Sequence, residues 1–213
     1  MSLITPEATL SFPALFAPRK VDPADESEVP KYSATLIFDE EAQADPLYVA
    51  LKAAAVEAAV EEFGPDAQEM LVSGKLNWPF LAGKDASAPE GTTVLRVRSK
   101  NAPGVVSIIP GTDGRPAPIT NPEEMYAGAQ VRASLGVFAY NMAINKGVSF
   151  GLNNIQKIAD GERLDGRVPA ADEFDADASL AADLSAMDAD TDADGQPNPP
   201  AATTPGRSLA QLL

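Results

Sequence analysis

The sequence contains no cysteine and no histidine among its 213 residues. Without cysteine it can form no disulfide framework, no thiolate nucleophile and no thiolate zinc site. Without histidine it has no imidazole base or metal ligand, which excludes Ser–His–Asp hydrolases and cysteine proteases. No apolar stretch approaches the roughly 18 residues of a membrane span. Because the N-terminus also lacks the basic start and apolar core of a signal peptide, we expect a soluble, cytoplasmic protein with no membrane partner.

Positive charge is scarce, with 16 basic against 31 acidic side chains and a formal net charge of −15. The charge is unevenly spread along the chain. Residues 169–213 hold one basic and nine acidic groups, whereas residues 75–167 hold 11 basic and eight acidic groups. An overall pI near 4.3 argues against a nucleic-acid partner, but the mildly basic middle of the chain leaves that class of partner open.

The last 45 residues, 169–213, are dominated by Ala, Asp and Pro and contain one aromatic residue, Phe174. Such a segment cannot bury enough apolar surface to offset a backbone ordering cost of about 1–2 kcal/mol per residue. We therefore predict a folded domain over residues 1–168 and a disordered acidic C-terminal tail over residues 169–213.

The folded part is predicted to be mainly β. Asp45 as N-cap, Pro46 in the first turn and Gly64 as a stop predict one helix over residues 47–63. Alternation of apolar and polar residues predicts strands over 7–12, 31–38, 92–100, 129–140 and 148–158, with a long loop over 77–90. One helix inserted among these strands favours a small, mostly antiparallel barrel of five or six strands.

Two predicted strands carry unusual side chains on the face that should point outward. Arg96, Arg98 and Lys100 occupy alternate positions, so all three project from one face. In the strand over 129–140, Arg132, Phe138 and Tyr140 alternate with an apolar row. Cations that neutralise phosphates beside rings that stack on bases are typical of a single-strand nucleic-acid groove. The alternative is that the rings pack beneath a helix or loop and that the cations form an ordinary solvated face.

A second aromatic group lies in the predicted loop, where Trp78 and Phe80 flank Pro79. Loop-borne rings are common binding anchors, but a loop folded over the mouth of a barrel often buries its tryptophan, and both interpretations stay open. Neither a P-loop nor a GxGxxG motif is present. The carboxylate runs at 39–41, 61–62 and 123–124 fall at element ends, where solvated charge is the ordinary explanation. We therefore expect no catalytic centre, no metal site and no cofactor.

Several segments resemble a family of phage-encoded single-stranded DNA-binding proteins of the Enterobacter-phage type. They span about residues 5–167 and are SFPALFAP (11–18), Lys31 to Ser33, Tyr126 to Gly128, Arg132, Phe138 to Tyr140, Asn145 to Gly147, GLNNIQ (151–156) and Asp160 to Glu162. The resemblance implies an OB fold that binds single-stranded DNA without sequence preference in phage replication and recombination. By analogy with other such proteins, the acidic tail would compete with DNA and recruit replication or recombination partners.

The strand faces, rather than the resemblance, give the candidate DNA-binding residues. Phosphate contacts are predicted for Arg96, Arg98, Lys100, Arg132 and Lys146, and base stacking for Trp78, Phe80, Phe138 and Tyr140, with Lys31 and Tyr32 as further candidates. The alternative function is an acidic adaptor or DNA mimic that occupies the nucleic-acid site of another protein, which the net charge of −15 supports. A nuclease is the third hypothesis, although the sequence shows no site for one.

Overall fold

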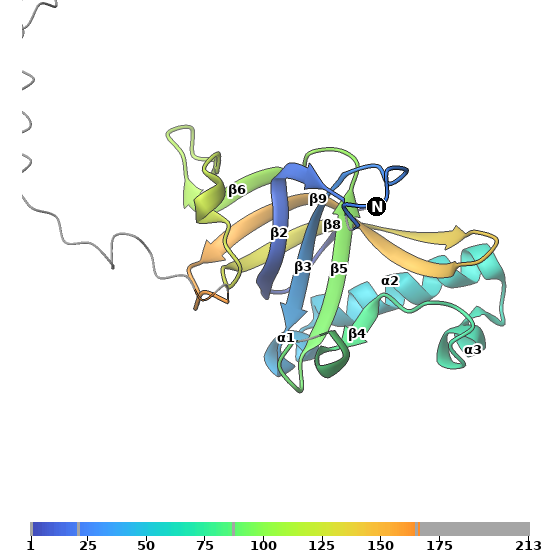
Figure 1. Ribbon diagram of the computed structural model, residues 1–213. Coiled ribbons are helices and arrows are strands. Elements are labelled where there is room, and N and C mark those ends of the chain that lie inside the picture. The colour runs from blue at the N-terminus through green and yellow to red at the C-terminus, as the bar shows by residue number, and fades with distance from the viewer. Residues whose placement is uncertain (1, 21, 87, 165, 167–213) are drawn as a thin grey trace, which may run out of the picture. The chain divides into compact units, whose positions relative to one another are not determined.

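The computed structural model describes residues 2–20, 22–86, 88–164 and 166, all within the unit Met1–Arg167 (Figure 1). The acidic tail predicted over residues 169–213 lies outside the described residues. The described part is mainly β. Its strands are β1 (Leu3–Ile4), β2 (Ala8–Arg19), β3 (Lys31–Phe38), β4 (Phe80–Ala82), β5 (Thr93–Ser99), β6 (Gly104–Pro110), β7 (Pro116–Pro118), β8 (Gln130–Asn141) and β9 (Lys146–Ala159), and its α-helices are α1 (Glu40–Ala44), α2 (Pro46–Phe63) and α3 (Ala67–Val72).

Five long strands pair in a closed ring. The pairings run from β8 to β2, β3, β5 and β9, and β9 pairs again with β8. Most are antiparallel, as predicted, but β5 and β6 each pair with β9 in parallel. The short strands extend this ring: β1 lies on β8, β4 on β5, and β6 with β7 on β9.

The predicted helix is confirmed as α2, and its signals act as expected. The Asp45 side chain accepts a 2.7 Å hydrogen bond from the backbone N–H of Leu47, and Gly64 ends the helix at φ +85°. The buried face is formed by Tyr48, Leu51, Ala55 and Ala59. The prediction of a single helix was incomplete, because α1 precedes α2 and α3 follows it.

The core is made by the inward rows of the ring together with α2. Rings from four elements meet there: Tyr48 lies 5.2 Å from Phe38 and 5.5 Å from Phe80, and Phe80 lies 5.7 Å from Phe150, centroid to centroid. Two of these contacts are edge-to-face and one is tilted, and aromatic pairs of this kind add about 0.5–1.5 kcal/mol each beyond the burial of apolar area. This cluster fixes α2 and β4 against the ring.

Two segments differ from their predicted form. The predicted 77–90 loop contains β4 and a 3-10 helix, Gly83–Ala86. The predicted first strand, 7–12, is longer in the structure, since β2 runs to Arg19 through register shifts after Ser11 and Ala14. No helix among the described residues is both long enough and apolar enough to cross a bilayer.

The end of the described chain is fixed to the loop before β8. The Tyr126 hydroxyl donates a 2.9 Å hydrogen bond to Asp160, and the backbone N–H of Leu164 donates to the Ala127 carbonyl. The Lys157 ammonium lies 2.7 Å from Asp160, and this contact, followed by the Tyr126 hydrogen bond, lowers the pKa of the Asp160 carboxyl below its ordinary value. The chain therefore leaves the ring from a defined position.

Candidate nucleic-acid interface

Strand β5 presents two guanidinium groups on the outer face of the ring. Arg96 and Arg98 are exposed, whereas Leu95 and Val97, which alternate with them, are buried. The alternation predicted from the sequence is therefore present, and its cause is the period of two in a β-strand. Lys100 is exposed just beyond the end of β5 and continues the same alternation.

The neighbouring strands place small uncharged side chains beside these cations. Arg96 is opposite Thr35 and Arg98 is opposite Ser33 in the β3–β5 register. One strand further, Ser11 of β2 is opposite Thr35. Among the described residues the one ion pair found joins Lys157 to Asp160, so neither Arg96 nor Arg98 is neutralised by a carboxylate in such a pair.

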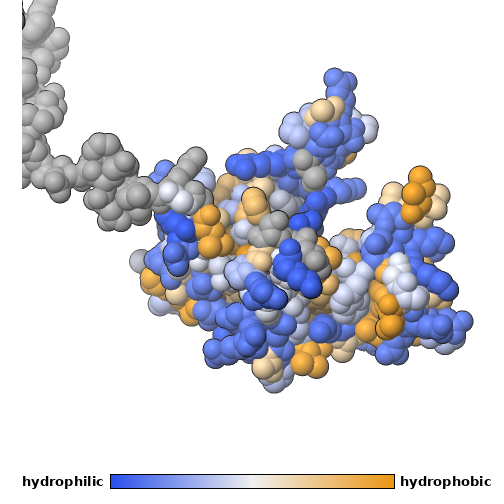
Figure 2. All heavy atoms as spheres, turned by 60° about the horizontal axis from the view of Figure 1, so that its bottom comes forward, coloured by the Kyte–Doolittle hydropathy of each residue, from blue (hydrophilic) through white to orange (hydrophobic). Residues whose placement is uncertain are grey.

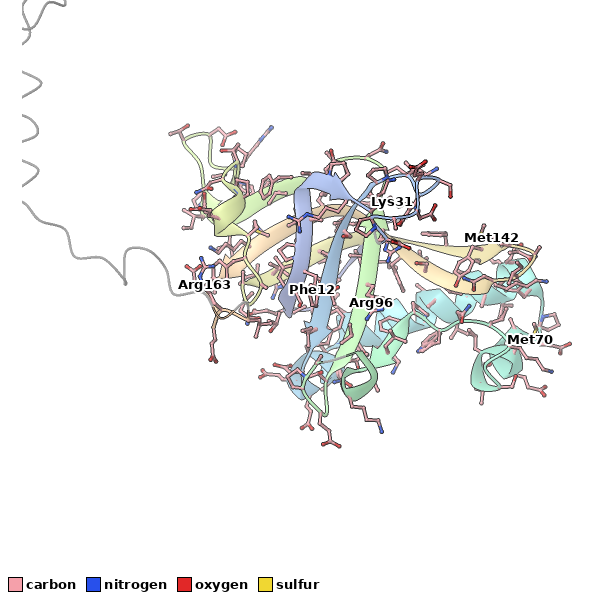
Figure 3. The ribbon with its side chains drawn as sticks, viewed as in Figure 1. Phe12, Lys31, Met70, Arg96, Met142 and Arg163 are labelled. Atoms are coloured by element: carbon pink, nitrogen blue, oxygen red, sulfur yellow. The ribbon has the colours of Figure 1, made fainter. Side chains whose placement is uncertain are left out.

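Phe12 projects from β2 on this same side of the ring. Its backbone has φ +44°, a left-handed conformation that is rare for a bulky residue, and 79% of its surface is exposed. It falls in the register shift between Ser11 and Ala14, next to Pro13, which has no N–H to donate to the ladder. The fold thus holds an aromatic ring out toward solvent on the part of the sheet that carries Arg96, with Lys31 further along (Figure 3).

A hollow of about 330 Å³ lies between Phe12 and the cations of β2, β3 and β5. Four cationic side chains and one carboxylate line it. Arg19 pairs with Lys31 across β2 and β3, and Lys20 donates to the Asp25 carbonyl at 2.9 Å. We define the basic face as the six residues Phe12, Arg19, Lys20, Lys31, Arg96 and Arg98.

The outer surface continues from the basic face over β9 and β8. Arg98 is opposite Gly151 of β9, and Gly151 is opposite Gly136 of β8. Phe138, two residues beyond Gly136, is 49% exposed, and Tyr140 follows on the same side of β8 by alternation. By this alternation the rings of Phe138 and Tyr140 lie on the side of the sheet that carries Arg96 and Arg98, and Phe138 also borders a hollow lined by carboxylates of α2.

The two aromatic candidates of the predicted loop, Trp78 and Phe80, lie on the side of α2 and not on the basic face. Phe80 is buried, with 7% of its surface exposed, and Trp78 is 5.3 Å from it, centroid to centroid. Trp78 also lines a shallow hollow with Val56 of α2 and Leu71 of α3. Figure 2, viewed from the end of the molecule that carries the helices, shows hydrophobic atoms in small, separate patches. The rings of Trp78 and Phe80 therefore act in packing.

Three further candidates are set apart from the basic face by the alternation of their strands or by their neighbours. Tyr32 alternates with Ser33 and lies on the inward side of β3, opposite Ser99. Lys146 lies at the start of β9 opposite Asn141, whose side chain reaches Glu62 of α2 at 3.3 Å. Both residues are on the opposite face from Arg98.

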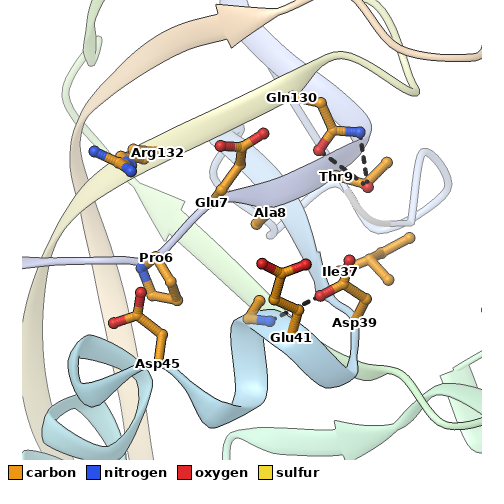
Figure 4. Close-up of a pocket in the computed structure, with 11 residues that line it drawn as sticks. Pro6, Glu7, Ala8, Thr9, Ile37, Asp39, Glu41, Asp45, Gln130 and Arg132 are labelled. Atoms are coloured by element: carbon orange, nitrogen blue, oxygen red, sulfur yellow. Dashed lines mark hydrogen bonds between the residues drawn. The ribbon is translucent and has the colours of Figure 1, made fainter.

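Arg132, the third of these, lies in an acidic hollow. It lines a space of about 310 Å³ with four carboxylates, Glu7, Asp39, Glu41 and Asp45 (Figure 4). Two of these carboxylates cap helices: Asp39 caps α1 and Asp45 caps α2. The local charge there is negative, which disfavours phosphate.

The sequence analysis missed Phe12, Arg19 and Lys20. Arg19 and Lys20 are adjacent basic residues at the end of β2. Counting charges along this strand could have identified them as candidate phosphate contacts. Phe12 gave no such signal, because its exposure comes from its backbone conformation. Within the described ranges no group of three or more acidic side chains is arranged to hold a metal ion.

Solved structures with a similar fold include proteins from two phages. The single-stranded DNA-binding protein of bacteriophage Enc34 in complex with ssDNA matches with a TM-score of 0.59 and 17% identity, covering 76% of this chain and 89% of that chain. A second structure of the Enc34 protein matches with a TM-score of 0.57 and 19% identity, over 82% and 90% of the two chains. The single-stranded DNA-binding protein gp2.5 of bacteriophage T7 matches with a TM-score of 0.51 and 14% identity, over 83% and 98%.

A comparison with curated proteins finds no match. The family described as the ssDNA-binding protein of Enterobacter phage Enc34 matches residues 1–185, which is most of the sequence and includes every described residue. The resemblance inferred from the sequence is confirmed by this match: the chain belongs to the family of phage single-stranded DNA-binding proteins typified by that of Enterobacter phage Enc34.

Proposed function

We propose that this protein binds single-stranded DNA, without sequence preference and without catalysis, across the outer face of an OB-type barrel. The observation that carries the proposal is the register that aligns Arg96 and Arg98 with short side chains of β3 and β2, beside the exposed ring of Phe12. Cations in a row neutralise successive phosphates, and an exposed ring stacks on any base because every base has a π-face. The closed ring of pairings supports the barrel.

The proposed contacts are a subset of the sequence candidates together with the residues that the structure adds. Lys31, Arg96, Arg98 and Lys100, with Arg19 and Lys20, would contact phosphates. Phe12, Phe138 and Tyr140 would stack on bases. Tyr32, Trp78, Phe80, Arg132 and Lys146 are left out of the interface, because they lie on the inward or α2 side or among carboxylates.

Family membership supports a role in phage DNA replication and recombination, which would place the protein in the cytoplasm of an infected bacterium. The acidic segment 169–213 carries nine carboxylates on the same chain as the basic face. Tethering gives such groups a high effective concentration, so they would compete weakly with DNA. When DNA displaces them, they would be free to recruit replication or recombination proteins.

The test is fluorescence anisotropy of labelled oligonucleotides with the full chain. We expect oligo-dT, oligo-dC and a mixed single strand to bind with similar affinity, more tightly than a duplex of equal length, and less tightly as salt rises. An acidic adaptor or DNA mimic would leave every oligonucleotide unbound. Mg²⁺-dependent shortening of the oligonucleotide by the pure protein would contradict the non-catalytic role.

A further inference from the structure

Two glycines in the middle of strands stand out, because the fold itself gives no reason for them. Glycine in a strand interior weakens the strand, so it often marks a close approach of backbone or ligand. Most of the described glycines have a structural reason. In five of them a Cβ would lie closer than 3.0 Å to a neighbouring atom: Gly83, Gly104, Gly128, Gly147 and Gly161. Positive φ explains Gly64, Gly74, Gly91, Gly114 and Gly166, and it also applies to Gly128.

Gly136 and Gly151 meet neither condition. A Cβ on Gly136 would be 3.8 Å from the nearest atom, the Nδ2 of Asn153, and a Cβ on Gly151 would be 3.7 Å from the Gly136 carbonyl oxygen. Both distances are ordinary van der Waals contacts, and neither glycine has positive φ. An alanine would therefore fit at both positions without displacing a neighbour.

These two glycines are paired directly with each other and lie beside the proposed DNA contacts. Gly136 of β8 is opposite Gly151 of β9, and Gly151 is opposite Arg98 of β5. The Cε1 atom of Phe138 lies 3.9 Å from the position that a Cβ would take on Gly151. Bare peptide backbone thus extends between a guanidinium on one side and a half-exposed aromatic ring on the other. We call this pair of glycines the glycine floor.

We infer that the glycine floor is a seat for one unpaired nucleotide of the bound strand. The base lies flat over the peptide groups of Gly136 and Gly151 with the Phe138 ring at its margin, and Arg98 neutralises the adjoining phosphate. A side chain at either position would occupy the place of the base, which explains why both residues are glycine. A duplex cannot use the seat, because its bases are already stacked and offer no free face. This inference rests on the proposed function.

The test compares Gly151→Val and Gly136→Val with the full wild-type chain, using anisotropy of labelled oligo-dT and thermal melting. Valine suits a strand better than glycine, so the melting temperature should stay the same or rise. Binding should weaken by about tenfold or more, as expected for loss of a stacked base. The matched control is Gly111→Val in the turn after β6, where a Cβ also has room at 3.5 Å, and this variant should bind like the wild type.

The outcomes separate the two levels of the proposal. If the wild type binds oligo-dT and both floor variants bind equally well, the glycine floor is wrong while DNA binding stands. If the wild type does not bind, the proposed function itself fails. Should a valine variant not fold, Gly151→Ala adds one methyl group in ordinary contact, and it should still weaken binding measurably. Wild-type affinity in folded Gly151→Ala and Gly136→Ala proteins would also overturn the seat.

Discussion

Replacing Arg96 and Arg98 together by alanine tests the electrostatic basis of the interface. Each side chain is exposed, and neither joins the ion pair found among the described residues, so their removal should leave the fold intact. Six cations, the five of the basic face and Lys100, can each neutralise one phosphate. At about −0.7 per contact on a single strand, the slope of log affinity against log salt should be about −4.2, and about −2.8 in the double variant.

These slopes predict a measurable difference over an accessible salt range. Between roughly 50 and 200 mM salt the wild-type affinity should fall about 300-fold, and that of the Arg96→Ala/Arg98→Ala variant about 50-fold. The assay is a titration of labelled oligo-dT at four or five salt concentrations. Because the lost contacts are to phosphate, the variant should bind weakly to every single-stranded sequence alike.

The matched control removes the same charge elsewhere. Lys75 and Arg115 are both exposed and neither belongs to the basic face, so Lys75→Ala/Arg115→Ala has the same net charge as the double arginine variant. It should keep the wild-type slope. Equal slopes in the wild type and in Arg96→Ala/Arg98→Ala would refute phosphate binding by β5, and an equal loss in both variants would show that only net charge matters.

Further predictions concern the rings and the tail. Phe12→Ala should weaken oligo-dT binding by about 1–3 kcal/mol, measured by anisotropy, with an unchanged melting temperature because the ring is 79% exposed; wild-type affinity would exclude stacking there. The fluorescence emission of Trp78, the one tryptophan, should change little when oligo-dT is added, because this ring packs on the α2 side. Strong quenching would show that DNA binds on the α2 side instead. Deleting residues 169–213 should tighten binding, chiefly at low salt, and equal or weaker binding would reject competition by the tail.

Local patterns were enough to predict the parts of the site that depend on one strand alone. Alternation gave the outward row of β5 and the inward row of β8, and capping residues gave the start of α2. These features depend on the period of a strand and on hydrogen bonds between near neighbours, both of which are written in consecutive residues.

Pairing between strands could not be predicted in the same way. That Arg98 lies beside Gly151, or that Arg132 lies among four carboxylates, depends on register between segments far apart in sequence. The side of the sheet on which Trp78 lies depends on the short pairing of β4 with β5, which a segment with two prolines did not suggest. Aromatic residue type therefore indicated a binding surface, but only the register decides which rings belong to it.

Gly128, unlike the two glycines of the glycine floor, is required by the fold itself, so Gly128→Ala should destabilise the protein. Its φ is +113°, and a Cβ would lie 1.9 Å from the Glu162 carbonyl oxygen, at the point where the end of the described chain crosses the loop before β8. Positive φ and overpacking against backbone each cost about 1–3 kcal/mol, so the free energy of unfolding should fall by about 2–6 kcal/mol in urea denaturation. Gly151→Ala, whose Cβ would meet its neighbours at ordinary van der Waals distances and which has no positive φ, is the control and should not be destabilised. If both variants unfold at the same urea concentration as the wild type, contacts at Gly128 do not fix the chain end, and the distinction between packed and open glycines fails with them.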